Sequence, residues 1–275
     1  MTDFSIGEVA ERTGVAEGTL RMWERRHGFP APERLPTGHR RYSERDVELV
    51  CRVVAERAAG VSLAVAIERA GRESEADVVS VYASLRRRWP DLEPRRLAKP
   101  VMVALSHAIE DESLSRADRP LMFASFQRER FYRQGQARWR ELARGARLAL
   151  VFADFQRVRS PRGGPVEIRV DRSHPLTREW AIVCDAAHHA VCLAAWEPPS
   201  AATAPDAERV FEAIWSVEPR VVREAARTCV EIATSVRPGL VESARSSLEP
   251  EPAPVTGEQL RLAAAITNRT LSYLG

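Results

Sequence analysis

Arginine side chains gather in one short stretch of this 275-residue chain. Seven arginines and three glutamates lie between residues 21 and 45, a local balance of +4 in a chain whose formal net charge is only +3. Clustered positive charge attracts nucleic-acid phosphates, and a guanidinium can also bond guanine in the major groove. This stretch therefore predicts double-stranded DNA as a partner.

Two short helices would position these arginines. Ser5 and Glu8 form a capping-box pattern at the start of a helix that Gly14 would end, and a second helix is expected at about 17–27, closed by Gly28. In a helix-turn-helix of this kind the second helix enters the major groove while the first braces it.

The second helix and the segment after it supply the candidate contacts. Leu20 and Trp23 mark the inner face of that helix. Three prolines exclude a helix over 29–42 and predict a hairpin, the wing, with its tip near residues 36–38. The positions expected at the DNA are Thr19, Arg21, Trp23, Arg25, Arg26, His39, Arg40, Arg41 and Tyr42.

These motifs resemble those of the MerR family. The resemblance covers about 70 residues and rests on the runs Ile6-Gly7-Glu8-Val9-Ala10, Thr13-Gly14-Val15, Trp23-Glu24-Arg25-Arg26 and Gly38-His39-Arg40-Arg41-Tyr42. It implies a winged helix-turn-helix with four helices, a homodimer, a palindromic promoter site that is bent or untwisted, and an indirect action on RNA polymerase. Ala16 departs from the family pattern, in which a serine usually caps the recognition helix.

The rest of the chain predicts a second domain. Apolar runs at 121–126, 148–155, 180–184 and 191–196 indicate buried strands, and a helix at about 128–144 completes a strand–helix–strand unit. The predicted layout is multidomain: an all-α winged helix-turn-helix domain at 1–72, a helical linker and dimerisation region at 73–118, an α/β (α+β) sensory domain at 119–245, and a Pro/Glu linker with a C-terminal helix at 246–275.

Residues 76–245 resemble the DICT domain, a sensory module. The resemblance rests on runs such as Phe126-Gln127-Arg128-Glu129-Arg130-Phe131-Tyr132-Arg133, Trp139-Arg140-Glu141-Leu142-Ala143, Phe152-Ala153-Asp154-Phe155 and Arg178-Glu179-Trp180-Ala181. It implies that the domain senses an effector, a small molecule or a protein, whose identity the resemblance does not supply.

One group of polar residues follows the first two predicted strands. Ligand crevices in α/β sheets form at the carboxyl ends of strands, and a helix N-terminus favours anions. The candidate ligand-binding residues are therefore Arg128, Arg130, Tyr132, Arg133 and Asp154. An Arg/Glu network that pins the helix to the sheet explains the same residues equally well.

Cysteine and histidine spacing raises a metal or thiol site as an alternative. Cys184 and Cys192 flank the pair His188-His189. However, strand residues alternate between faces, and both cysteines lie in apolar runs. A hairpin with two buried cysteines and an exposed turn at His188-His189 is therefore the favoured interpretation, and no metal is expected. The four cysteines are sparse, which is typical of reduced thiols in a cytoplasmic protein.

The remaining classes of function find little support. The chain has no Gly-rich phosphate loop and no hydrolase or metalloprotease motif, so an enzyme is not expected. The MerR-type residues are similar to a branch of cobalamin-dependent repressors, but their Asp-x-His-x-x-Gly motif is missing, so no cofactor is expected. A cytoplasmic protein, nucleoid-associated when bound to DNA and without a membrane partner, is predicted. A signalling adaptor, whose second domain binds a partner protein, remains the alternative from another class.

Overall fold

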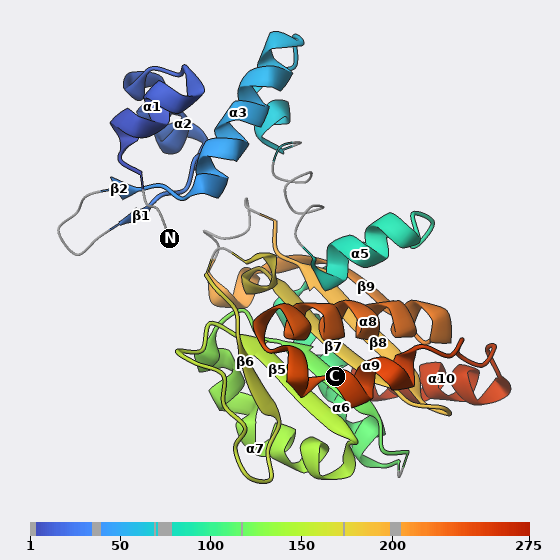
Figure 1. The fold of residues 1–275 in the computed structure, drawn as a ribbon. Helices are drawn as coiled ribbons and strands as arrows, with labels where there is room; N and C mark the ends of the chain where they lie inside the picture. The colour runs from blue at the N-terminus through green and yellow to red at the C-terminus, as the bar shows by residue number, and fades with distance from the viewer. Residues whose placement is uncertain are drawn as a thin grey trace. The chain divides into compact units, whose positions relative to one another are not determined.

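The computed structural model describes residues 4–34, 40–68, 70, 79–116, 118–172, 174–198 and 205–275. The chain divides into two compact units, Met1–Asp77 and Val78–Gly275 (Figure 1). The first is helical with a small hairpin, and the second is a mixed α/β domain. The predicted fold class, an all-α winged domain followed by an α/β domain, is confirmed. No helix in the described parts of the chain is both long and apolar enough to span a bilayer.

The first unit has its elements where the sequence predicts them. They are α1 (Ile6–Thr13), α2 (Glu17–His27), β1 (Glu33–Arg34), β2 (Arg40–Arg41) and α3 (Glu44–Ala58), followed by a helical segment at 63–68. The capping box of Ser5 and Glu8 opens α1, while Gly14 and Gly28 end α1 and α2 with φ of 70° and 65°, a left-handed conformation that favours glycine. Ala16 gives α2 no side-chain cap.

The core of the first unit holds the helix pair together. Val9 of α1, Leu20 of α2 and Val50 of α3 are fully buried and belong to one apolar cluster. The two strands pair antiparallel, with Glu33 opposite Arg41. The helix pair and the start of the wing therefore share one core.

The second unit is built around a seven-stranded sheet. Its elements are α5 (Val81–Arg88), β3 (Arg95–Ala98), α6 (Lys99–Leu114), β4 (Leu121–Ser125), α7 (Glu129–Gly145), β5 (Leu148–Ala153), β6 (Val166–Arg169), β7 (Glu179–Asp185), β8 (Ala190–Trp196), β9 (Val210–Ser216), α8 (Pro219–Val236), α9 (Glu242–Leu248) and α10 (Gly257–Leu274). The strand order is β3-β9-β8-β7-β4-β5-β6. Strands β4, β5 and β6 run parallel and the other pairs are antiparallel. The predicted strand–helix–strand unit is thus β4-α7-β5.

Helices cover both faces of this sheet (Figure 1). Helices α5, α8 and α9 pack on one face, and α6 and α7 pack on the other, where α10 also contributes Leu262 and Ile266. Alternate strand residues supply the two cores, as the two-residue period of a strand requires. On β4, Phe123 faces the α8 side and Met122 faces the α6 side.

The structure differs from the predicted layout between residues 73 and 118. That region is not a separate helical linker, because β3 pairs with β9 and α5 and α6 bury their apolar sides on the sheet. The second unit therefore starts near Val78 rather than at residue 119. Helix α9 also occupies part of the linker predicted at 246–255.

Candidate nucleic-acid interface and sensor site

Helix α2 has exposed arginines on one side and the buried residues Leu20 and Trp23 on the other. Arg25 and Arg26 are exposed and make no ion pair with any described residue. Arg21 is also exposed, with its Nη2 atom 2.7 Å from a carboxylate oxygen of Glu17 one turn earlier, and Thr19 is half-buried. Positive charge on one side of α2 is therefore free to meet an external anion.

Two of the predicted contact residues lie in the core instead. Trp23 is 7% exposed and Tyr42 only 1%, and both pack in the apolar cluster of the first unit. The backbone of Tyr42 also bonds that of Phe4, with N–O distances of 2.7 and 2.9 Å. Trp23 and Tyr42 therefore belong to the core that holds α2 and β2, and their side chains are not on the exposed side of α2 with Arg25 and Arg26.

The wing is tied to α2 by an ion pair. Arg40 donates from Nε to a carboxylate oxygen of Glu24 at 2.7 Å, and this hydrogen bond raises the pKa of the guanidinium. Arg41, the next residue of β2, is half-buried. His39 and the predicted tip at 36–38 lie outside the described residues. The structure thus brings Arg40 next to the helix that carries Arg25 and Arg26.

The candidate ligand residues of the second unit form an ion network. At the start of α7, Asp154 accepts a hydrogen bond from the backbone N of Glu129 at 2.6 Å, and Arg128 lies 3.5 Å from the same carboxylate. The guanidinium of Arg130 stacks over the Phe131 ring, 4.8 Å from its centroid. Tyr132 is fully buried, so it contributes to the core and not to a crevice.

Glu167 of β6 is the centre of this network, and no motif predicted its role. Arg133 reaches it at 2.6 Å and Arg159 at 2.8 Å, while Arg133 also bonds Glu129 of α7. Burial alone would raise the pKa of Glu167, but the two guanidiniums outweigh burial and hold that pKa below its usual range. These contacts fit the predicted network that pins helix to sheet.

Comparison with known proteins identifies both units. Residues 4–70 match the MerR HTH family of regulatory proteins, and residues 79–198 match DICT, described as a sensory domain in diguanylate cyclases and two-component systems. The chain joins a MerR domain to a DICT domain.

Curated relatives share only short stretches with this chain. The HTH-type transcriptional repressor CarA of Myxococcus xanthus is 46% identical over 65 residues, 22% of this chain and 23% of the relative. The regulator MlrA of Escherichia coli is 38% identical over 50 residues, 18% and 21% of the two chains. The mercuric resistance operon regulatory protein of Bacillus cereus is 44% identical over 45 residues, 16% and 34%. The chain thus covers about a third or less of these relatives.

The two cysteines considered for a metal or thiol site of the DICT domain lie on opposite faces of its sheet. Cys184 belongs to the core beneath α6 and Cys192 to the core beneath α8. Burial raises the pKa of each thiol to about 12. No group of three metal-binding side chains occurs among the residues that the structure describes. His188 is exposed but His189 is buried, so the predicted turn is only half at the surface.

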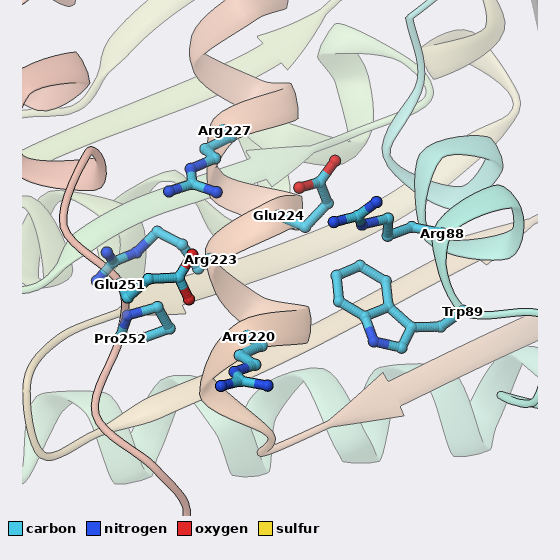
Figure 2. A pocket seen from close by; sticks show the side chains of 8 residues that line it. All are labelled: Arg88, Trp89, Arg220, Arg223, Glu224, Arg227, Glu251 and Pro252. Atoms are coloured by element: carbon cyan, nitrogen blue, oxygen red, sulfur yellow. The ribbon is translucent and has the colours of Figure 1, made fainter.

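Arginines on α8, which follows the DICT match in the second unit, also form contacts that stabilise the fold. A hollow of about 340 Å³ lies between α5, α8 and the segment after α9. Figure 2 shows the side chains that line it. Arg223 lies 2.6 Å from Asp185 of β7 and donates to the carbonyl of Pro250, and Arg227 donates to the carbonyl of Leu248 at 2.8 Å. These arginines therefore hold the segment at 248–250 in place.

Proposed function

We propose that this chain is a transcriptional regulator that binds duplex DNA through α2 and the wing of its MerR domain. The supporting observation is the division of α2: Leu20 and Trp23 hold the helix in the core, while Arg25 and Arg26 are exposed and form no ion pair with a residue that the structure describes. Arg is suited both to phosphates and to guanine edges. In this proposal Arg21 and Thr19 contact the backbone, and Arg40 and Arg41 reach a neighbouring phosphate or groove edge.

The proposed binding unit is a homodimer on a palindromic site, since two copies can place two recognition helices on two half-sites. In the predicted dimerisation region at 73–118, α5 and α6 are poor candidates for the dimer contact, because both are largely buried in the second unit. Helix α10 exposes Leu260, Leu271 and Leu274, so the C-terminal helix is the better candidate for the contact between copies.

The DICT domain would supply the regulation. An effector can change DNA binding only if it binds two states of the protein with different affinity. The proposal therefore requires an effector site in the second unit whose occupancy alters operator affinity, promoter distortion or the dimer equilibrium.

Footprinting on the promoter region of the chain's own gene tests the DNA-binding part. The full-length protein should protect one two-fold symmetric segment in the presence of random competitor, and its affinity should fall steeply with salt. Arg57→Ala on α3 provides a matched loss of one positive charge in the same domain. Equal binding to every duplex at modest ionic strength would contradict the proposal.

A further inference from the structure

A cavity of about 330 Å³ lies inside the DICT domain, on the side of the sheet covered by α6 and α7. It is lined by α6, by α7, by the residues that follow β4, and by β7. Its volume is within the range of small-molecule sites, roughly 300–1,000 Å³. It is also about twice that of a cavity known to hold one benzene ring, about 150 Å³. A two-ring molecule matches this size.

The walls of the cavity are aromatic and held in place. The rings of Phe126 and Trp139 meet edge to face with centroids 6.0 Å apart. Trp139 donates from Nε1 to Glu110 at 3.0 Å, and Trp180 donates from Nε1 to the Ser106 hydroxyl at 3.0 Å. Because hydrogen bonds fix both indoles, the walls are preorganised to stack on a flat ring.

The cations that line the cavity are already neutralised. Arg209 pairs with Glu197 at 2.6 Å, Lys99 pairs with Asp206, and Arg138 contacts Glu110 and Asp111. A charged ligand would have to break one of these pairs. The cavity therefore favours a molecule without net charge.

Glu110 of α6 lines this cavity without offering an acceptor to a ligand. It is 5% exposed, and its Oε1 atom accepts the bond from Trp139. Its Oε2 atom is buried and lies 2.5 Å from Nε of Arg138. The rings and apolar atoms of the walls are therefore the main surface that the cavity offers to a ligand.

Gly135 keeps the cavity open. It lies in the middle of α7, its φ is not in the left-handed region, and an added Cβ would meet only Trp139 Cδ1, at 3.9 Å. The helix backbone therefore does not require glycine here, although glycine destabilises a helix interior relative to alanine. Space for a ligand explains the residue.

We propose that this cavity binds a neutral, planar two-ring aromatic molecule whose faces contact the half-buried rings of Phe126 and Trp180. Binding itself does not depend on DNA recognition. Only the role of the molecule as the regulator's effector rests on the proposed function.

Two matched probes test the proposal on the full-length protein. Indole is a neutral two-ring compound, and indole-3-carboxylate carries the same rings with a negative charge. In calorimetric titration indole should bind at least about tenfold more tightly than indole-3-carboxylate, because the cations that line the cavity already have acidic partners. Equal affinities, or no binding of indole at millimolar concentration, would overturn the proposal.

Variants locate the site. Gly135→Leu should abolish indole binding by filling the cavity, whereas Gly145→Leu, at the exposed end of the same helix, should leave it unchanged. Val103→Phe on α6 fills the cavity from the other side and serves if Gly135→Leu fails to fold. Unchanged binding in a folded filled variant would overturn the assignment. These titrations use no DNA, so failure of DNA binding in the footprint leaves their outcome unaffected.

Discussion

The two domains use arginine in opposite ways. On α2 of the MerR domain Arg25 and Arg26 are exposed and have no ion-pair partner in the described part of the chain. In the second unit, which contains the DICT domain, Arg133, Arg209 and Arg223 each lie 2.6 Å from a carboxylate that is mostly buried. Arginines of the first kind hold charge available for a partner, and those of the second kind neutralise acids that folding has buried. The presence or absence of a buried acidic partner thus distinguishes arginines that stabilise the fold from those of the proposed DNA interface.

The largest expected effect comes from removing an arginine that is paired with a buried carboxylate. Arg133→Ala leaves the fully buried Glu167 with only Arg159, so we expect the DICT domain to lose about 3 kcal/mol of unfolding free energy, the low end for breaking a buried pair. Urea denaturation measures this loss. Arg169→Ala, which removes an exposed pair with Asp171, is the control and should change little. Equal effects of the two variants would contradict the distinction.

Arg138 is the exception within the DICT domain, because the acid that it faces keeps a raised pKa. Burial raises the pKa of Glu110 from 4.5 to about 7, although Arg138 and the Trp139 hydrogen bond oppose the shift and Asp111 adds to it. The folded state therefore holds this proton more tightly than the unfolded state. The stability due to Glu110 is fully present below pH 4.5 and is lost as the pH rises to about 7.

Glu110→Gln should remove that pH dependence. Relative to the wild type, the variant should gain on the order of 3 kcal/mol in unfolding free energy between pH 4.5 and 7. The pKa of His107, on the same helix, is lowered mainly by burial, but His107 titrates in both proteins and cancels in the difference. Urea titrations at several pH values measure the trend, and parallel curves for the two proteins would refute it.

Removing an arginine of the proposed interface should weaken DNA binding and leave the unfolding free energy nearly unchanged. Arg25→Ala should weaken operator binding about tenfold and lower the salt slope by about one, because one phosphate or base contact is lost. Its unfolding free energy should stay within about 0.5 kcal/mol of the wild type, as for other surface substitutions. Fluorescence anisotropy at several salt concentrations gives both binding quantities, with Arg57→Ala as the control.

Arg40 both pairs with an acidic residue of the fold and lies in the proposed interface. Its removal should give the smallest effects in this series. Its side chain is 32% exposed and pairs with Glu24, which is 16% exposed. Arg40→Ala should lower stability by less than about 1 kcal/mol and weaken DNA binding less than Arg25→Ala does. The same anisotropy and urea measurements apply. A larger loss of affinity than for Arg25→Ala would move the main contact from α2 to the wing.

Local signals predicted the MerR domain well. The capping box at Ser5 and the glycines at 14 and 28 fix the helix ends through contacts within a few residues, so the sequence shows them directly. The sequence assigns Trp23 both to the inner face of the helix and to the DNA contacts, and its burial decides for the inner face. The burial of Tyr42 was harder to predict, because this residue belongs to a contact motif and only the packed core shows that it is buried.

Long-range pairing explains what was missed in the DICT domain. Strand β3 has mostly exposed residues without alternation and pairs only with β9, more than a hundred residues later. Glu167 lies on the short strand β6, so the network around Arg133 could not be assembled from the α7 sequence alone. The cavity draws on α6, α7 and β7, which no local pattern connects.

Helix α10 closes the outer side of the helix that forms one wall of the cavity. Near its C-terminal end, Tyr273 bonds Asp111 and Arg269 bonds Glu112 at 2.8 Å, the two residues that follow Glu110 on α6. The final helix is thus bonded to the turn of α6 that carries Glu110. Displacement of α10 would remove these bonds and loosen this wall of the cavity, although α10 does not itself line the cavity at Glu110.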